Sequence, residues 1–467
     1  MDIKSVYRRF IEIEDQYDLF SICIDNIKIW QFIRAYLYPK LVENICNIKS
    51  PVNDFQAVKT EEKVSLWHWI KTNPYLVHKK DLIIVGCPRR VFDGKYYVDL
   101  FTDEIICHLK YSYYLFERCN YMGNHYNPVK IKGIKYNDRY IRSQIETYDS
   151  KEVKQKINKI LDIFEKEFSM KWTNSQKKQI VSLSNTLLSD YNINYRRYCA
   201  FLLDRIKPKA VVLVKYYEIE NMILIQEAKK RNIPIIELQH GMMDDVMPVY
   251  NYLKKHNFDT YPDYIFTFGE YDKKIAHYPI DKKYIIPVGY PDLEKKVRLY
   301  RRTETKKQIT FFSGDSIKLE EFAIYLNQVL DKNVYKIVFK LHPMQYQQWK
   351  KLYVKLAGTD IEVIDNNHKD SAYYLAQSDF VIGIATTVLF EATLFPCKIG
   401  ILEEDGYQSM QSLYQNKQAY LVKTKEELVN FVTNKNFFEP EPGNYYEKNA
   451  ISNINNALKK IITKRKN

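Results

Sequence analysis

The sequence is poor in the residues and runs that mark several protein classes. It has 467 residues, with 13 glycines and seven cysteines. The cysteines are dispersed and form no C-x-x-C pair, which favours reduced thiols over a disulfide framework or a zinc site. The longest uncharged apolar stretch, Phe380 to Phe390, is well short of the roughly 20 residues that span a bilayer. No apolar segment of the secretory type follows the first residues, so we expect a cytoplasmic protein.

Several sequence motifs of known chemistry are also missing. There is no G-x-x-x-x-G-K-[ST], which argues against a kinase or P-loop NTPase, and no G-x-G-x-x-G, which argues against a nicotinamide dehydrogenase. No G-x-S-x-G elbow indicates a serine hydrolase. RNP, zinc-finger and helix-turn-helix signatures are absent, so nucleic acid is not an expected partner.

The chain is strongly basic, with 71 Lys and Arg against 57 Asp and Glu and a net charge of +14. The densest basic runs are Lys295 to Lys307 and Lys459 to Lys466. Two interpretations stay open for this charge. It is a solvated basic surface, or it holds the protein peripherally on the anionic inner face of the cell membrane.

Apolar runs and helical patterns alternate over two stretches of the chain. This alternation predicts an α/β protein with two parallel-sheet domains, because parallel strands need helical crossovers. The strand Asp81–Gly86 opens the first domain after a helical N-terminal region. The predicted divisions are an N-terminal helical region 1–80, a first domain 81–291, a charged linker 292–307, a second domain 308–444, and a C-terminal helix with a basic tail 445–467.

The segment Ser378 to Ala392 is the most informative part of the second domain. An apolar strand enters a turn at Gly383, after which Thr386 and Thr387 open a helix. Free backbone N–H groups make such a helix end an anion site, and two hydroxyls add donors for phosphate oxygens. Glu391, one turn further on, is placed to accept hydrogen bonds from ribose hydroxyls. The alternative is an ordinary threonine N-cap with a solvated glutamate.

Two further strand ends in the second domain carry candidate donor-binding residues. His342, followed by Pro343, ends a predicted strand and is placed to bind a diphosphate or protonate a leaving group. Its alternative is a structural histidine. Ser313 and Gly314, followed by Asp315, form a glycine-containing turn that can approach the donor through its backbone.

The first domain offers Gln239-His240-Gly241 at the end of a predicted strand. His240 and Asp244 are the candidate catalytic residues, with His240 as the base on an acceptor hydroxyl or as a contact to the donor. The alternative is a loop histidine that caps the next helix. Asp244 and Asp245 are adjacent and point in different directions on a regular element, so we expect no metal site and no cofactor.

Five segments together resemble one superfamily. They are QHG at 239–241, PDYIFTFG at 262–269, VGYP at 288–291, KLHP at 340–343 and SDFVIGIATTVLFEA at 378–392. In order and spacing they resemble bacterial GT-B glycosyltransferases of surface and capsular polysaccharide biosynthesis. The chain is similar to capsule Kdo transferases, CDP-glycerol glycerophosphotransferases and bacterial sialyltransferases over about residues 208–425.

The resemblance implies a GT-B fold, in which two Rossmann-like domains face each other across a cleft, here with extra N-terminal helices. It implies that His342 and the Thr386-Thr387 helix end bind the nucleotide phosphates, that Glu391 lies near the ribose, and that His240 lies across the cleft. One departure is that Glu404-Asp405-Gly406 follows the His-Pro, whereas sialyltransferases place an acidic-acidic-glycine motif with the catalytic base before it. The contiguous Gln-His-Gly is closer to the capsule transferases, which favours a cytidine-linked donor.

The expected function is metal-independent transfer of a sugar from a nucleotide-activated donor, such as CMP-Kdo or CMP-sialic acid. The acceptor is a hydroxyl of a bacterial surface polysaccharide or of its lipid-linked precursor. Three alternatives stay open: a CDP-glycerol or CDP-ribitol polyol-phosphate transferase, a nucleotide-sugar 2-epimerase, and a non-catalytic GT-B subunit of a polysaccharide assembly complex.

Overall fold

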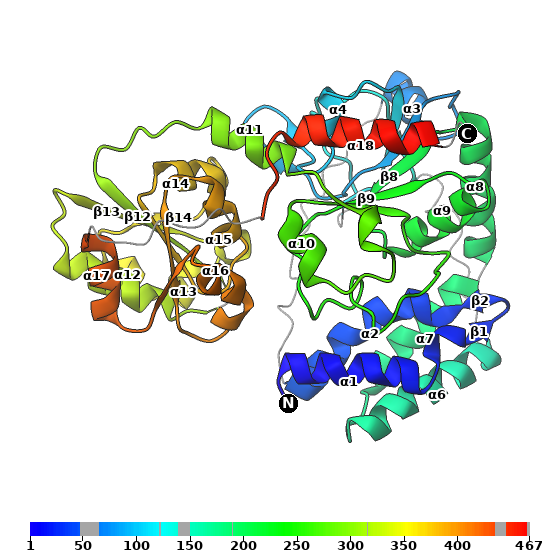
Figure 1. Ribbon diagram of the computed structural model, residues 1–467, viewed down its shortest axis with the longest axis horizontal. Helices are drawn as coiled ribbons and strands as arrows, with labels where there is room; N and C mark the ends of the chain where they lie inside the picture. The colour runs from blue at the N-terminus through cyan, green and yellow to red at the C-terminus, as the bar shows by residue number, and fades with distance from the viewer. Residues whose placement is uncertain are drawn as a thin grey trace.

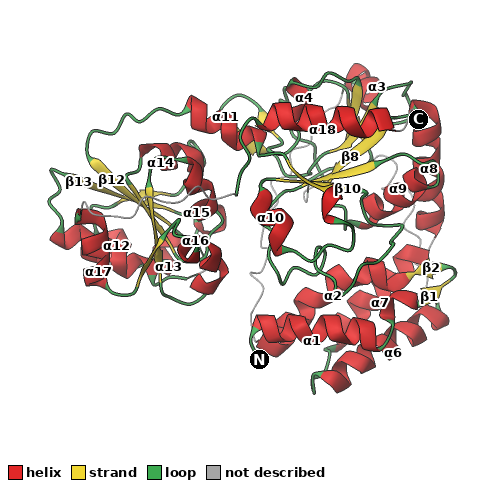
Figure 2. Ribbon diagram, viewed as in Figure 1, coloured by secondary structure: helices red, strands yellow, loops and turns green. Residues whose placement is uncertain are grey.

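The structure is a computed structural model that describes residues 1–46, 65–120, 123–138, 150–188, 190–314, 316–434 and 445–464. Asp315, part of the predicted N-terminal region and the last three residues of the basic tail lie outside the described residues. Two lobes stand side by side, each with a sheet at its centre and helices around it (Figures 1 and 2). The predicted α/β class with two parallel-sheet domains is confirmed.

The first lobe is built on a seven-stranded sheet in the order β11-β10-β9-β8-β3-β6-β7. Every neighbouring pair is parallel. The strands are β3 (Leu82–Val85), β6 (Tyr113–Glu117), β7 (Ile134–Tyr136), β8 (Ala210–Val214), β9 (Ile235–Leu238), β10 (Tyr264–Thr267) and β11 (Ile285–Pro287). All residues of β8 are buried, as expected for a strand covered on both faces.

Helices of the first lobe include α3 (Leu66–Thr72), α4 (Asp103–Cys107), α8 (Asp190–Ile206), α9 (Ile219–Lys229) and α10 (Glu270–Ile275). Two short antiparallel hairpins are β1 (Cys23–Ile24) with β2 (Ile27–Lys28), and β4 (Val91–Phe92) with β5 (Tyr97–Val98). The strands β6 and β7 were not predicted from the sequence. Their runs are short and rich in tyrosine, so they lack the aliphatic character that marked the other strands.

The N-terminal helices pack together below the first sheet (Figure 1). They are α1 (Ile3–Gln16), α2 (Ile29–Cys46), α6 (Lys151–Glu167) and α7 (Asn174–Leu188). A fully buried ion pair joins α1 to α2, with 2.7 Å between Arg34 Nε and Glu14 Oε1. Arg34 also donates to the backbone carbonyl of Pro248, so the guanidinium ties the helices to the loop after β9.

The charged segment between the two sheets is partly helical, since α11 spans Pro291–Leu299. The sequence predicted a linker here. Four of its cations are paired within the chain: Lys295 with Glu104, Lys296 with Asp292 and Asp370, Arg298 with Glu294, and Arg302 with Asp379. The pair between Lys296 and Asp370 joins α11 to the second lobe at 3.0 Å.

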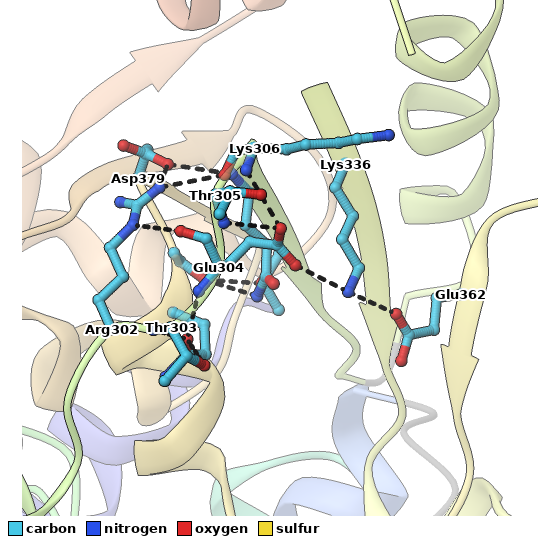
Figure 3. Close-up of polar contacts among 12 residues, drawn as sticks. Arg302, Thr303, Glu304, Thr305, Lys306, Lys336, Glu362 and Asp379 are labelled. Atoms are coloured by element: carbon cyan, nitrogen blue, oxygen red, sulfur yellow. Dashed lines mark hydrogen bonds and ion pairs between the residues drawn. The ribbon is translucent and has the colours of Figure 1, made fainter. Parts of the chain in front are cut away.

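The strand that opens the second lobe is fixed by polar contacts at its entry (Figure 3). Arg302 donates to Asp379 at 2.6 Å, and Glu304 accepts from the backbone N–H groups of Thr305 and Lys306. The Nζ of Lys336 lies 3.0 Å from Glu304 and 3.0 Å from Glu362. These contacts anchor the segment directly before β12.

The second lobe holds a six-stranded parallel sheet in the order β14-β13-β12-β15-β16-β17. The strands are β12 (Lys307–Phe312), β13 (Tyr335–Lys340), β14 (Glu362–Ile364), β15 (Phe380–Gly383), β16 (Lys398–Leu402) and β17 (Tyr420–Val422). The helices are α12 (Leu319–Val329), α13 (Trp349–Leu352), α14 (Ser371–Gln377), α15 (Val388–Glu391), α16 (Gln411–Gln415) and α17 (Lys425–Thr433). A helix expected over 346–356 is only the four-residue α13, flanked by short 3-10 turns.

The last helix, α18 (Ala450–Lys464), returns to the first lobe and lies across its sheet (Figure 1). Leu458 and Ile461 belong to the same buried cluster as Leu82 and Phe266 of that sheet. Gly289 permits the crossing, because a Cβ there would lie 2.3 Å from the carbonyl oxygen of Glu447. Among the described residues, no helix is long and apolar enough to cross a membrane.

Candidate functional site

The candidate donor residues follow three adjacent strands of the second sheet. The sheet order places β13, β12 and β15 side by side and parallel. His342 follows β13, Ser313 follows β12, and Thr386 follows β15. Ligands of open parallel sheets bind outside the carboxyl ends of the strands. The topology therefore brings these three segments, which are far apart in sequence, to one edge of the sheet.

Ser313 links the first two of these segments. Its side chain is buried, accepts a hydrogen bond from the backbone N–H of His342 at 2.7 Å, and donates to Oε1 of Gln345 at 2.6 Å. The amide of Gln345 donates in turn to the carbonyl of Gly314 at 2.8 Å. These bonds fix both loops at this edge of the sheet.

His342 is exposed, and its ring is oriented by its own backbone. The backbone N–H of Met344 donates to Nδ1 of His342 at 3.3 Å. In a neutral imidazole this leaves the proton on Nε2, which makes Nε2 a donor. Pro343, also exposed, begins the 3-10 turn η3 (Pro343–Gln345) and keeps the ring at the strand end.

Thr386 and Thr387 lie in the turn after β15 rather than on a long helix. α15 has only four residues and continues as the 3-10 turn η5 (Ala392–Leu394). Gly383 allows the turn to be tight, since a Cβ there would lie 3.1 Å from Cγ2 of Thr386. Gly314 allows the neighbouring loop to approach, since its Cβ would lie 3.0 Å from the carbonyl oxygen of Ala385.

The loop after β16 reaches the same edge. Glu404 pairs with Lys318 at 2.7 Å, and Gly406 has a φ of +94°. A Cβ on Gly406 would lie 3.4 Å from the Cβ of Ala385, in the loop that follows β15. The acidic-acidic-glycine string thus lies beside the Thr386 turn.

Glu391, the last residue of α15, is half-buried in an acidic environment. Burial raises the pKa of its carboxyl to about 7, Lys296 opposes the rise, and Asp370 and Asp292 add to it. Near neutral pH this carboxyl is therefore partly protonated, and it both donates and accepts hydrogen bonds. Glu391 also contributes to raising the pKa of Tyr290, which opens α11 between the two sheets.

In the first lobe, the side chain of Gln239 shapes the turn that carries His240. Its amide donates to the carbonyl of Gly241 at 2.7 Å and to Oδ1 of Asp272 at 2.8 Å, and its oxygen accepts from the backbone N–H of Phe268. Burial raises the pKa of Asp272 to about 7. The glutamine of the Gln-His-Gly motif thus has a structural role, since its side chain joins the loops after β9 and β10.

His240 itself is partly buried and contacts Tyr217, with 3.1 Å between His240 Nε2 and the tyrosine hydroxyl. Burial and, to a smaller extent, the nearby Lys215 lower the pKa of this imidazole to about 4. The ring is therefore neutral at physiological pH. Asp244 lies on the surface, where its carboxylate accepts from the backbone N–H of Val246 at 2.9 Å.

Tyr217 and Lys215 were not singled out from the sequence. Both directly follow the predicted strand Ala210–Val214, so the strand-end rule that selected His240 would have found them as well. Among the described residues, no group of three or more His, Cys, Asp or Glu side chains is arranged to hold a metal ion.

The two lobes touch beside these residues. The ring of Tyr271 in α10 lies 6.2 Å from that of Phe390, which directly precedes Glu391. Met242, two residues after His240, packs against the buried cluster of the second lobe that includes Phe390. The candidate residues of both lobes thus flank the contact between them.

Comparison with known proteins gives similarity at the level of fold. No family model matches the chain, and no curated protein matches it. The UDP-GlcNAc 2-epimerase from Neisseria meningitidis bound to UDP-GlcNAc is 12% identical, with 81% of this chain and 99% of that chain covered and a TM-score of 0.47. The Methanocaldococcus jannaschii UDP-GlcNAc 2-epimerase with UDP-GlcNAc and UDP is 14% identical, with 82% and 99% covered and a TM-score of 0.43.

The wall teichoic acid polymerase TagF soaked with CDPG is similar over its whole length. It is 12% identical, with 99% of each chain covered and a TM-score of 0.43. At such identities and TM-scores the likeness assigns no activity to this chain.

Proposed function

We propose that the protein is a glycosyltransferase that moves a sugar from a nucleotide-activated donor to a hydroxyl of a bacterial surface polysaccharide or its lipid-linked precursor. The observation that carries this proposal is the meeting of Ser313, His342 and Thr386 at the ends of three adjacent parallel strands. The motif resemblance favours a cytidine-linked donor such as CMP-Kdo or CMP-sialic acid. The stretch 308–444 is the donor-side domain, and 81–291 with α18 is the acceptor-side domain.

The donor phosphates would lie at the edge formed by β12, β13 and β15. Nε2 of His342 and the hydroxyls of Thr386 and Thr387 are the donors that we assign to the phosphate oxygens. Such donors stabilise the charge that develops as the bond between the sugar and the phosphate breaks. In this proposal no cation is required. Glu391 would accept hydrogen bonds from the ribose hydroxyls.

His240 is the proposed base, with Asp244 beside it on the same loop. During transfer the acceptor oxygen bonds to the anomeric carbon, the nucleotide leaves with the bonding electrons, and the acceptor proton goes to the base. A pKa of about 4 keeps the imidazole of His240 unprotonated at neutral pH, as a base requires. Donor phosphates bound nearby would raise this pKa and make the ring a stronger base.

A thermal-shift panel with CMP, CDP, UMP, UDP and GDP tests the donor site. Ligand binding raises the melting temperature in proportion to RT ln(1 + [L]/Kd). We expect a shift selective for cytidine nucleotides in the wild type and in His368→Ala, whose exposed histidine belongs to the same lobe. The shift should be lost in His342→Ala.

Other outcomes of this panel, and of activity assays beside it, have definite meanings. A uridine-selective shift would remove the cytidine assignment, and conversion of a donor without acceptor would make the protein an epimerase. Release of CMP from a CDP-polyol would instead identify the polyol-phosphate transferase. No shift with any nucleotide would contradict the proposal and favour a non-catalytic subunit.

We also propose peripheral contact with anionic membrane through α3. Leu66 and Trp67 are more than 70% exposed, at 74% and 72%, and Trp69 is 47% exposed. Lys71 follows in the last turn of the helix. Tryptophan with neighbouring lysine is the composition of helices that lie in the membrane interface. Since four of the linker cations are already paired within the chain, α3 is the better contact.

Co-sedimentation with lipid vesicles tests this contact. The double variant Trp67→Ser, Trp69→Ser should bind vesicles containing phosphatidylglycerol about tenfold more weakly than the wild type, because two aromatic anchors are lost. Leu253→Ser, which removes another exposed apolar side chain from the same lobe, is the control. Equal binding by the double variant and the control would rule out α3 as the membrane contact.

A further inference from the structure

An open pocket of about 600 Å³ lies between the N-terminal helices and the first sheet. One wall is α2, through Phe32 and Tyr36, with α7 beside it. The opposite wall is formed by the segments that follow β3, β6 and β8, including Arg118 and Tyr217. A pocket of this volume accommodates one or two sugar rings, within the range of small-molecule sites.

The pocket lies where the strand order of the first sheet reverses. β3 is the first strand of this sheet along the chain, and β6 and β8 pair with it on opposite sides. Chain connections from such a strand run in opposite directions, and the resulting crevice at the carboxyl ends is the usual ligand site of an open α/β sheet.

One side chain links the pocket to the candidate base. Tyr217 lines the pocket, and the hydroxyl of Tyr217 is 3.1 Å from Nε2 of His240. A ligand in the pocket would therefore contact the residue that holds His240. This position suits the substrate that loses a proton, which is the acceptor in the proposed transfer.

The charged side chains of the lining are mostly acidic. Arg118 is the one cation of the described lining, whereas Glu218, Glu220 and Asp138 are carboxylates. Arg118 is already paired with Glu218 and, at 2.8 Å, with Glu220. An incoming phosphate or carboxylate group would therefore meet a neutralised arginine and further negative charge.

The uncharged part of the lining is aromatic. Tyr36 and Tyr217 are its accessible rings, with Tyr36 38% exposed and the buried Phe32 behind them. Aromatic faces pack against the apolar C–H face of a pyranose, and carboxylates accept hydrogen bonds from its hydroxyls. The carboxylates repel a ligand that carries negative charge.

We propose that this pocket binds an uncharged sugar residue at the end of the acceptor glycan, and that it discriminates against acidic sugars and polyol phosphates. The role of this sugar as the acceptor rests on the proposed function, but the binding of a neutral sugar to the pocket does not depend on it. By this proposal a polyol-phosphate chain is an unsuitable acceptor, since it carries one negative charge per repeating unit.

The test is saturation-transfer NMR on the full chain with lactose and chitobiose as neutral probes, and with sialyllactose and glycerol 1-phosphate as anionic probes. We expect the neutral probes to bind the wild type at least about fivefold more tightly than the anionic ones. Tyr36→Ala should abolish the saturation transfer from neutral probes. Tyr325→Ala, which removes a partly exposed tyrosine from the second lobe, should leave it unchanged.

A second variant checks the charge argument. Glu218→Gln combined with Glu220→Gln frees Arg118, so binding of sialyllactose should improve about tenfold relative to lactose. Tighter binding of anionic than neutral probes by the wild type would overturn the proposal. So would neutral binding that survives Tyr36→Ala in a protein whose melting temperature is unchanged.

The nucleotide panel keeps the two proposals separable. Neutral-sugar binding without any nucleotide shift would support the pocket and contradict the transferase. A nucleotide shift with no sugar binding, in the absence and presence of the nucleotide, would do the reverse.

Discussion

Glu237 lies inside β9 with its side chain fully buried. Its Oε1 accepts hydrogen bonds from the hydroxyl of Tyr250 at 2.8 Å and from the backbone N–H of Tyr216 at 3.2 Å. Burial nevertheless raises the pKa of this carboxyl to about 8, because two neutral donors do not replace the lost hydration. The folded protein therefore holds a proton here at neutral pH.

This proton makes stability depend on pH with a definite sign. In the unfolded chain a glutamate titrates near about 4.3, so between pH ~4.3 and ~8 only the folded state keeps the proton. The unfolding free energy therefore falls as the pH rises through this window. Glu237→Gln keeps the shape and the acceptor oxygen but removes the titration.

We expect Glu237→Gln to unfold in urea like the wild type at pH 4 and to be more stable at pH 8. The gain is about 1.4 kcal/mol for each unit by which the folded pKa exceeds the unfolded one. Asp272 and Glu391, whose pKa values are also raised by burial, remain in both proteins and cancel in the difference. Glu152→Gln on the exposed side of α6 is the control. A difference that does not grow with pH would mean that Glu237 is ionised in the folded state.

For single residues, the sequence predicts site candidates by their position directly after a predicted strand. That rule selected Ser313, His342 and Thr386, and the structure places all three at adjacent strand ends. The rule does not predict the hydrogen bonds that orient these residues, such as the bond from the backbone N–H of His342 to Oγ of Ser313. The burial of Glu237 was not predicted either, because a glutamate within an apolar run is ordinarily expected to be exposed.

At the scale of elements, Gly289 allows the chain to pass close by where it returns from the second lobe to the first. It has a φ of +93°, and its missing Cβ makes room for Glu447 and for Ala450, the first residue of α18. Gly289→Ala would impose both an unfavourable backbone conformation and a clash with main-chain atoms. We expect a loss of about 2–4 kcal/mol in the urea unfolding free energy and faster proteolysis of α18.

The matched substitution is Gly358→Ala. A Cβ at Gly358 meets nothing within 4 Å, so this variant should unfold close to the wild type. Equal destabilisation by the two variants would show that the close approach of residues 447–450 to Gly289 is not what requires glycine there.

Elements with long apolar runs were predictable, and elements defined by their neighbours were not. The predicted strand at 210–214 is β8, and the predicted helix over 218–231 is α9. The sequence predicted a linker at α11, because most of its nine residues are charged and they show little periodicity. The burial of Leu293 in an apolar cluster stabilises this helix. Helix stability from tertiary packing leaves little trace in the local sequence.

For the whole molecule, the largest surprise is that the first lobe is discontinuous in sequence. Its sheet is covered by α18, whose Ile454, Leu458, Ile461 and Ile462 are buried against it. At about 1.5–3 kcal/mol for each such side chain, this helix contributes on the order of 6–12 kcal/mol. That is comparable with the entire stability of a typical domain.

A chain ending at residue 299 should therefore be largely insoluble or molten, whereas the same chain with residues 445–467 appended by a flexible linker should fold. Soluble yield and the cooperativity of thermal unfolding are the measurements. If residues 1–299 alone unfold cooperatively at the temperature of the first lobe in the full protein, α18 is dispensable for its stability.

The return of α18 also has a consequence for biosynthesis. A ribosome releases the strands of the first lobe early, but the helix that covers them is made after the whole second lobe. The second lobe can thus complete its core during translation, whereas the earlier-made half waits with an uncovered apolar face until α18 has been synthesised. Any transcript truncated before codon 450 would yield a product whose older half is unfinished, which makes such fragments natural targets for chaperones and proteases.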